Sequence, residues 1–574
     1  MLDRAAPQRS PLTCGQMSFP FDIYRCGEEG ANINTPMTNR IGPPLLVILM
    51  APDVAIWAQQ PQLLLDINSG SSNSSPSRFV DVSGSILFLA STPATGSELW
   101  RTDGTSGGTQ LVKDIRPGPL QSSSRWLTAI DGTLYFSADD GVHGDELWKS
   151  DGSEAGTSMI KNINPVSNNS LYPGQPTGLD GFVYFTAGEP DTGDELWRTD
   201  GTEIGTTLVK DIYPGGESSD VSQMIAVNGQ LLFWAVADTN GWALWRSDGT
   251  EEGTVLVKDV EPEGTPTVLQ EFYEVGGIAY FSGTDTIHGG ELWRTDGTEA
   301  GTWMVKDIRP GMEGSWIAEM RVLGGGVIFS ALTDELGREL WMSDGTLEGT
   351  YVVTDLNPGP EDGTMGLFNP VVVGDWLFFV GNDGTLQPPI GIYKSDGIET
   401  YLLTDLLGGI GSLSYGCEGV FFDGHDGIHG WELWYSNGTS SGTYMVHDIN
   451  TGSSDSHPND IVDVGDRIFF SATTSQLGAE LWVCPCAAVG IAEPMADEGL
   501  IIGPVPTSGS VRIALPETDG AWQLAFIDVQ GRTVHLIPGA TGSILIDTND
   551  WRTGVYELLA RSNEKQLRGR MVVQ

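Results

Sequence analysis

Five charged residues that are not repeated along this 574-residue chain are its candidates for acid–base chemistry. Two carboxyl groups held roughly 5 to 9.5 Å apart can hydrolyse a glycoside, one as acid and the other as nucleophile or base. Spacing in the sequence does not show that such a pair converges, and scattered carboxylates in an acidic chain are typical of a solvated surface. We therefore assign no catalytic residue and keep an extracellular glycoside hydrolase or lyase as an alternative. The five residues are Asp81, Arg125, Glu271, Glu319 and Arg321.

Histidines offer a second kind of chemistry. His143, His288 and His429 each lie five residues before a tryptophan in the same local context, so they recur with a repeat and are interpreted as loop-forming residues. His425, His447 and His457 do not form a convincing cluster in the sequence. The chain also lacks the Gly-x-Ser-x-Gly, HExxH, P-loop and Asp-x-Asp-x-Asp-Gly motifs. No cofactor is expected, metal ligands are not identified, and calcium is allowed without a standard motif.

Aromatic residues are the candidates for ligand binding. They lie at or near the starts of the segments that vary most between repeats, and large rigid rings supply contact area at low entropic cost. The alternative interpretation is that they fill the core, where aromatic residues are common. The candidates are Trp126, Tyr172, Phe272, Trp316 and Phe368.

The element that must position these residues is a repeat, seen most clearly as ELWRTDGTEIGTTLVKDIYPG from Glu195 to Gly215. Its tryptophan recurs at steps of 48 or 49 residues, Tyr393 replaces it in the seventh copy, and two further copies follow. Nine copies of one supersecondary unit predict a repeat architecture. The tryptophans are Trp100, Trp148, Trp197, Trp245, Trp293, Trp341, Trp434 and Trp482.

Each copy contains four short apolar runs bounded by Asp-Gly or Pro. In the second copy the runs are 126–130, 134–138, 146–149 and 158–163. This punctuation is typical of hairpins, and no window has an amphipathic period of 3.6 residues. Four antiparallel strands per unit predict the blade of a β-propeller. We expect the repeated tryptophans to pack between blades and the Asp of each DGT loop to hold its turn.

The ends of the repeat array predict a closed ring. The array begins with a lone outer strand at 63–67 and ends on a third strand at 479–483, with no fourth strand after it. Pairing these two segments would complete the last blade and remove exposed sheet edges. The predicted fold class is therefore all-β, with a closed propeller of about nine four-stranded blades.

The repeat resembles the ELWxxDGT repeat family of bacterial surface and secreted proteins, through Glu98-Leu99-Trp100-Arg101-Thr102-Asp103-Gly104-Thr105 and its copies over roughly residues 60 to 484. The resemblance implies a propeller-like extracellular module and does not supply an activity. The sequence departs locally, with Ala243 for Glu in the fourth copy and Asn437 for Asp in the eighth.

The net charge of -47 disfavours nucleic acid and anionic membranes as partners. Much of this negative charge comes from residues that recur in the repeats, the Glu of ELW and the Asp of DGT and KDI. We interpret these residues as a solvated acidic surface.

Residues 1–58 are interpreted as an N-terminal extension with a secretory signal from Met37 to Ala58, whose apolar run is too short to span a membrane. Cys14 and Cys26 precede the expected cleavage site. Cys484 and Cys486, near the end of the propeller at 59–486, are interpreted as a local bridge or as free thiols.

After a linker at 487–499, residues 500–574 do not repeat. Short alternating segments broken by Gly and Pro predict a small β-sandwich. The motifs at 503–509, 526–532, 553–556 and 571–573 look like those of the C-terminal sorting domain of the type IX secretion system of Bacteroidota. This resemblance implies the secretion machinery as a partner and a secreted or cell-surface location.

Together these features predict a monomeric, non-catalytic binding or adhesion module with a polysaccharide or extracellular protein as ligand. A purely structural surface protein is a further alternative.

Overall fold

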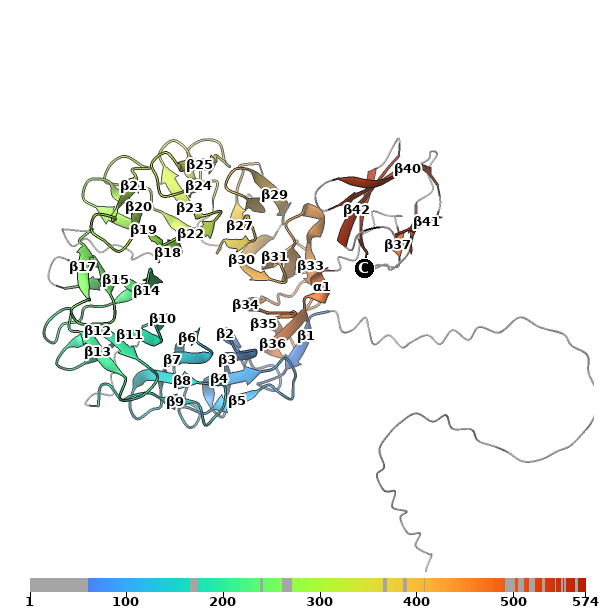
Figure 1. The fold of residues 1–574 in the computed structure, drawn as a ribbon. Coiled ribbons are helices and arrows are strands. Elements are labelled where there is room, and N and C mark those ends of the chain that lie inside the picture. Colours follow the sequence, from blue (N-terminus) through green and yellow to red (C-terminus); the bar gives the residue numbers. More distant parts are fainter. Residues whose placement is uncertain are drawn as a thin grey trace, which may run out of the picture. The chain divides into compact units, whose positions relative to one another are not determined.

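A computed structural model shows nine sheets that follow one another around a central opening (Figure 1). The structure describes residues 60–165, 174–237, 241–260, 271–364, 369–385, 390–406, 408–490 and 501–573, except 504–509, 516–521, 529–531, 542, 549–550, 552–553 and 563–565. The expected signal segment, Tyr172 and Phe368 lie outside the described residues. Among the described residues, no helix has the length and apolar character needed to cross a membrane.

Each sheet is antiparallel, and in blades 1 to 8 its four strands pair in chain order. Blade 1 consists of β2 (Ser77–Val82), β3 (Ser85–Thr92), β4 (Gly96–Thr102) and β5 (Gln110–Lys113), and blade 2 of β6 (Arg125–Ile130), β7 (Thr133–Asp139), β8 (Asp145–Ser150) and β9 (Ser158–Met159). Blade 3 consists of β10 (Thr177–Leu179), β11 (Phe182–Glu189), β12 (Gly193–Thr199) and β13 (Thr207–Lys210), and blade 4 of β14 (Ser222–Val227), β15 (Gln230–Val236), β16 (Trp242–Ser247) and β17 (Val255–Lys258).

Blades 5 to 8 continue the same order. Blade 5 consists of β18 (Tyr273–Val275), β19 (Ile278–Asp285), β20 (Gly289–Thr295) and β21 (Trp303–Lys306), and blade 6 of β22 (Ala318–Leu323), β23 (Gly326–Thr333), β24 (Gly337–Ser343) and β25 (Thr350–Thr354). Blade 7 consists of β26 (Val371–Val373), β27 (Trp376–Gly381), β28 (Gly391–Ser395) and β29 (Thr400–Asp405). Blade 8 consists of β30 (Gly409–Gly416), β31 (Gly419–His425), β32 (Trp431–Ser436) and β33 (Thr443–His447), with the short η2 (Ser440–Gly442) before β33.

Blade 9 closes the ring. It combines β34 (Asn459–Val464), β35 (Arg467–Thr474) and β36 (Gly478–Pro485) with β1 (Gln62–Leu65) from the start of the array, and the short α1 (Ala487–Gly490) follows β36. Strand β1 runs antiparallel to β36 with Leu63 opposite Trp482. The first strands of neighbouring blades border the opening, where β34 contacts both β30 and β2 (Figure 1). The predictions of nine four-stranded blades and of closure by the first strand are confirmed.

The Asp residues of the DGT loops hold turns, as expected. The carboxylate of Asp103 accepts hydrogen bonds from the backbone N–H of Thr105 at 2.9 Å and from its hydroxyl at 2.7 Å. Equivalent bonds occur at Asp200, Asp248, Asp296 and Asp344. These hydrogen bonds lower the pKa of the Asp103 carboxyl.

The repeated tryptophans pack between blades, which confirms the prediction for them. Trp148 of blade 2 belongs to one core cluster with Leu87 and Leu89 of blade 1. The basic residues of the repeat add polar contacts across the same boundary, since Lys113 donates to the carbonyl oxygen of Thr157 at 2.7 Å and Arg101 to that of Gly152 at 3.1 Å. Neighbouring blades are therefore joined by apolar burial and by hydrogen bonds to backbone carbonyls.

The Glu of ELW is buried, so the interpretation of a solvated acidic surface is wrong for this residue. Glu195 is 0% exposed, and its carboxylate accepts bonds from the Ile212 N–H at 2.8 Å and the Ser219 hydroxyl at 2.7 Å. Ile212 follows the outer strand of blade 3 and Ser219 precedes the inner strand of blade 4. The carboxylate thus fixes the chain where it crosses between blades. The other buried members of this set are Glu98, Glu146, Glu291, Glu339, Glu432 and Glu480.

The C-terminal segment forms two sheets around its own core, which confirms the predicted β-sandwich. One sheet contains β37 (Ile501–Gly503), β38 (Ser510–Ala514) and β41 (Ser543–Asp547), and the other contains β40 (Thr533–Ala540), β39 (Trp522–Asp528), β42 (Gly554–Arg561) and β43 (Gln566–Val573). Ile513 and Ile546 of the first sheet share a buried cluster with Trp522, Phe526 and Leu558 of the second.

The buried glutamates predict that the propeller loses stability as the pH rises. Burial raises the pKa of Glu195 from 4.5 to about 7, against the opposing hydrogen bonds, so the folded state binds a proton that the unfolded state releases between these values. The contribution of Glu195 to stability is therefore fully present below pH 4.5 and is lost as the pH rises through 7. Thermal melts at pH 5.5 and 8 should show a higher Tm at pH 5.5, and the difference should persist in 1 M NaCl because salt screens only exposed charges.

Glu195→Gln should flatten part of this pH dependence and cost about 1–3 kcal/mol at pH 5.5, because the amide nitrogen cannot accept the hydrogen bonds that an oxygen of the Glu195 carboxyl group accepts. The control is Glu203→Gln, which changes an exposed glutamate of the same blade. An unchanged Tm between pH 5.5 and 8 at high salt would contradict the assignment.

Candidate functional site

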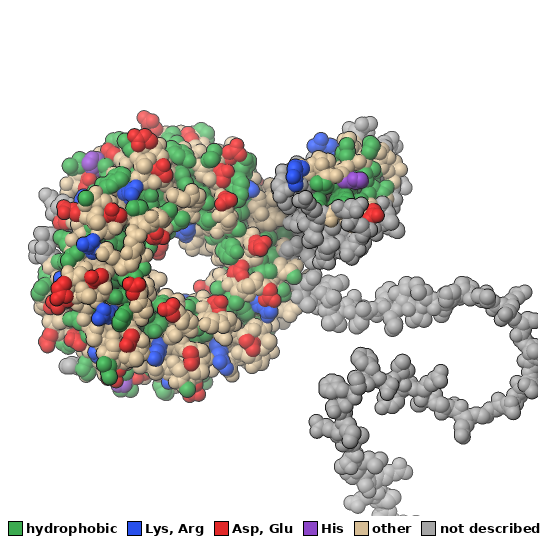
Figure 2. Space-filling view, in the orientation of Figure 1, with side chains coloured by type: hydrophobic (Ala, Val, Ile, Leu, Met, Phe, Trp, Pro, Cys, Tyr) green, Lys and Arg blue, Asp and Glu red, His purple; other side chains and the backbone are tan. Residues whose placement is uncertain are grey.

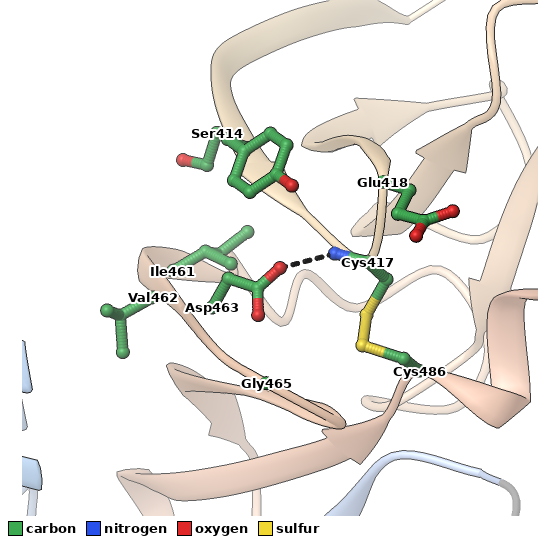
Figure 3. A pocket seen from close by; sticks show the side chains of 9 residues that line it. Ser414, Cys417, Glu418, Ile461, Val462, Asp463, Gly465 and Cys486 are labelled. Carbon is green, nitrogen blue, oxygen red and sulfur yellow. Dashed lines mark hydrogen bonds between the residues drawn. A yellow bond between two sulfur atoms is a disulfide. The ribbon is translucent and has the colours of Figure 1, made fainter. Parts of the chain in front are cut away.

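A groove lies between the inner-strand regions of blades 8 and 9 (Figure 3). Its volume is about 890 Å³. The turn after β30 supplies one wall and β34 with the turn after it supplies the other. The lining residues are Ser414, Tyr415, Cys417, Glu418, Ile461, Val462, Asp463, Gly465 and Cys486.

A disulfide between Cys417 and Cys486 lies in this groove, across 69 residues of sequence (Figure 3). The expectation of a local bridge within Cys-Pro-Cys, or of free thiols at both positions, is wrong for Cys486. Cys484 is buried in the core shared by blades 8 and 9, and burial raises the pKa of its thiol to about 12. The thiol of Cys484 is therefore protonated and unreactive at neutral pH.

The groove is suited to contact rather than to acid–base chemistry. Asp463 accepts a hydrogen bond from the Cys417 N–H at 2.6 Å, so its carboxylate holds the turn that carries the disulfide (Figure 3). Cys417, Asp463 and Cys486 are close enough to share a metal ion, but the bridged sulfurs offer no thiolate. Tyr415, which is 47% exposed, supplies an accessible aromatic ring.

Of the three predicted binding aromatics that the structure describes, two are exposed. Trp126 is 44% exposed on β6 and Trp316 is 62% exposed just before β22, both in blades whose first strands border the opening. Phe272 is 8% exposed and stacks on Trp234 of the preceding blade at 5.3 Å. Phe272 fills the boundary between blades 4 and 5, which agrees with the alternative interpretation that this ring belongs to the core.

The backbone at both exposed tryptophans is left-handed, with φ of 55° at Trp126 and 53° at Trp316. Such φ values are uncommon for bulky residues and cost free energy. The register of β6 shifts between Arg125 and Thr128, so Trp126 lies in a β-bulge. A bulge redirects a side chain and is frequent beside binding sites. The same left-handed position recurs at Arg78, Gln223, Glu319 and Asp460, with the same register shift in β2, β14, β22 and β34, so this backbone is a feature of the repeat and only the exposed rings are specific to their blades.

The charged candidates have structural partners. Asp81 accepts a bond from the Gly84 N–H at 2.7 Å, which fixes the turn after β2. Arg125 lies 3.9 Å from Asp145. Burial lowers the pKa of Arg338, and the negative charge of Glu319, on β22, opposes this shift.

Glu271 and Arg321 meet at a tyrosine. The Tyr273 hydroxyl donates to Glu271 at 3.0 Å and accepts from Arg321 at 3.3 Å, while Arg321 also donates to the Pro370 carbonyl at 2.8 Å. Burial and the Glu271 charge raise the pKa of Tyr273 to about 12. The structure thus brings two of the five charged candidates together, as a hydrogen-bonded link between blades 5 and 6 and not as a carboxylate pair.

The repeated histidines are loop residues, as interpreted. The Nδ1 atoms of His143, His288 and His429 lie 2.7, 2.8 and 2.6 Å from an Asp three residues earlier. In contrast, the prediction that the other histidines do not cluster is wrong for His425 and His457, whose rings both contact Trp431. A sequence signal existed, because Asp423 beside them occupies a strand position that holds Ser in four other blades.

No known protein family matches the sequence, and no curated protein matches it. Among solved structures the chain is similar to puromycin hydrolase, with 14% identity over 58% of this chain, a TM-score of 0.32, and coverage of only 54% of that enzyme. It is also similar to the β-propeller domain of the Trilobed protease from Pyrococcus furiosus, with 13% identity over 58% of this chain and 99% of that domain, and a TM-score of 0.30.

A third similar structure is PorZ of Porphyromonas gingivalis, a bacterial surface component of the type-IX secretion system. The identity is 12% over 87% of this chain and 86% of that chain, with a TM-score of 0.19. The chain spans about half the length of the enzymes that it resembles. At these identities and scores, the similarities carry no information about activity.

The disulfide predicts a covalent contribution to propeller stability. Replacing Cys417 and Cys486 together by Ser should lower the free energy of unfolding by about 4 kcal/mol, because the bridge closes a long loop in the unfolded chain. Thermal unfolding of the full chain without reductant measures this loss as a lower Tm. Cys484→Ala, which leaves the bridge intact, is the matched control, and recovery of a Cys484–Cys486 peptide in non-reducing digests would contradict the pairing.

Proposed function

We propose that the chain is a secreted or cell-surface ELWxxDGT-type propeller that acts as a non-catalytic binding or adhesion module. One observation carries this proposal: the repeated polar residues are engaged in turns and blade boundaries, whereas exposed tryptophans break the repeat beside the opening. Glu195, Asp200 and His288 illustrate the first class, and Trp126 and Trp316 the second. Regular polar residues therefore support the fold, and irregular exposed rings remain for recognition.

The ligand is best described as a polysaccharide or an extracellular protein. Aromatic side chains on a rigid scaffold bind both classes with little loss of conformational entropy. The net charge of -47 disfavours polyanions, including nucleic acid. Tyr172 and Phe368 stay in the proposed set because they occupy comparable places in the sequence. The protein is proposed to act as a monomer and without a cofactor, with calcium allowed.

Export through a type IX-like system is the second part of the proposal. The C-terminal β-sandwich contains Trp522 and Tyr556 in its own buried core, which suits a separate domain. Its ordered motifs support a role as a secretion address, with the secretion machinery as partner. A glycoside hydrolase or lyase and a purely structural surface protein remain the alternatives.

Binding predicts a clear mutational result. A glycan and matrix-protein array should identify ligands whose binding weakens at least tenfold in Trp126→Ala or Trp316→Ala, because each change removes an exposed contact ring. Ile204→Ala, which removes a side chain that is 94% exposed in a DGT loop, is the control and should bind normally. Hydrolysis of a glycoside or peptide that is lost in Glu271→Gln or Glu319→Gln would establish the enzyme instead.

Export predicts a separate result. In a host with a type IX system, removal of residues 500–574 should abolish extracellular release and leave the melting transition of the propeller in place. Immunoblots of medium and cell fractions measure the release, and circular dichroism of the shortened chain checks the fold. Equal release of both forms would show that the segment is not the address.

A further inference from the structure

A cluster of non-repeated side chains lies where blade 8 meets blade 9. It combines Asp423 and His425 on β31, Trp431 at the start of β32, and Asp455 and His457 in the segment before β34. We call these five residues the seam cluster. The cluster joins two blades, because the first three residues belong to blade 8 and His457 directly precedes the first strand of blade 9.

His457 is the centre of the seam cluster. Its Nδ1 atom lies 3.2 Å from the Asp423 carboxylate, and its Nε2 atom lies 3.6 Å from that of Asp455. The ring stacks on Trp431 at 6.1 Å with an interplanar angle of 29°, and His425 meets the same Trp431 ring edge-on at 5.7 Å. The imidazole is thus held between two carboxylates and against an aromatic face.

The backbone of blade 8 is adapted to this cluster. A Cβ atom on Gly409 would lie 2.9 Å from Trp431, and one on Gly411 would lie 3.0 Å from the Asp423 Cβ. At Gly408 a Cβ atom would overlap the His425 ring. Glycine at these three positions is therefore required for the rings and the carboxylate to lie against the start of β30.

Asp423 places a charge at a strand position that is uncharged in the other blades. Asp423 lies opposite Leu433, the Leu of ELW in blade 8. At the equivalent position four other blades carry Ser, and none of the other eight blades carries a charged residue. One carboxylate oxygen of Asp423 is buried without a hydrogen-bond partner, as is one oxygen of the repeated Asp114, Asp211 and Asp307, so this feature alone does not distinguish Asp423. Burial raises the pKa of Asp423 to about 6, while the bond from His457 opposes the shift. The contact between the Asp423 carboxylate and His457 Nδ1 orients the imidazole.

The outward side of the cluster has unused hydrogen-bonding capacity. The side chains of His457 and Asp455 are 55% and 45% exposed. Their separation of 3.6 Å is too long for a good hydrogen bond. When the Nδ1–H of His457 is directed at Asp423, Nε2 of the neutral ring is a hydrogen-bond acceptor, so Nε2 and the Asp455 carboxylate can each accept a hydrogen bond from a sugar hydroxyl. Beside this pair, the Trp431–His457 stack offers apolar ring surface.

We propose that the seam cluster is a binding site for a neutral saccharide. A sugar ring supplies both an apolar face for the aromatic stack and hydroxyls that donate and accept. Neutral sugars are favoured over acidic ones because Asp423 and Asp455 repel anions. Trp431, His457 and Asp455 contact the sugar, and Asp423 is a positioning residue that fixes the imidazole. The proposal names a ligand class within the proposed binding function and uses a site separate from Trp126 and Trp316.

Calorimetry on the full chain tests the site with cellohexaose, xylohexaose, laminarihexaose, maltohexaose and chitohexaose. At least one should bind, with affinity lowered at least tenfold in Trp431→Ala and His457→Ala and less in Asp423→Asn. His143→Ala, which alters a loop histidine on blade 2, is the matched control and should bind like the parent. Thermal melts of each variant separate lost binding from lost folding.

Histidine NMR gives a readout that needs no substitution. In protein labelled at histidine, the active sugar should shift the His457 and His425 resonances and leave those of His143 and His288 unchanged. Absence of binding by all five sugars, equal binding by every variant, or binding only of a lysine-rich peptide would overturn the proposal. Affinity lost in Trp126→Ala but retained in Trp431→Ala would overturn this site and leave the proposed function standing.

Discussion

The interaction on which the ring depends is the buried carboxylate of the repeated ELW triplet. In blade 3 it binds the backbone after the outer strand and the hydroxyl before the next inner strand, through Ile212 and Ser219. A propeller chain must return from the rim of one blade to the centre of the next, and this crossing leaves backbone N–H groups without sheet partners. A carboxylate accepts several such bonds at once, which a hydroxyl or an amide side chain does less well.

The same arrangement changes the meaning of the high acidity. Burying a charge is unfavourable unless hydrogen bonds compensate, and here the compensation comes from groups that would otherwise be unsatisfied themselves. The propeller therefore contains two acidic populations. The DGT carboxylates such as Asp103 lie at the surface with pKa values lowered by hydrogen bonds, whereas the ELW carboxylates such as Glu195 are buried with raised pKa values. Overall net charge does not distinguish them.

The sequence predicted the regular part of the fold well, because a repeat period and its turn residues determine strand number, blade order and closure. It did not predict the burial of Glu195, because alternation along a strand does not reveal which polar residue receives backbone donors from another segment. The Cys417–Cys486 bridge spans 69 residues, and Asp423 and His457 lie 34 residues apart in neighbouring blades. Such contacts depend on how blades meet, which local pattern does not encode. Trp126 is exposed, while Phe272, chosen by the same sequence pattern, fills a blade boundary.

In a propeller of similar blades, a repeated residue has an equivalent environment in most blades, and selection for folding explains its presence there. A single ligand site needs residues that the other blades lack. The described departures are of two kinds. Phe272 and Trp234 repair packing between blades, whereas Trp126 and Asp423 leave exposed apolar surface or an unpartnered carboxylate oxygen. An unpartnered oxygen also occurs at the repeated Asp114 and Asp211, so what distinguishes Asp423 is its charge at a position that is uncharged in the other blades. The other blades fold without such residues, so the presence of Asp423 and Trp126 is better explained by recognition than by stability.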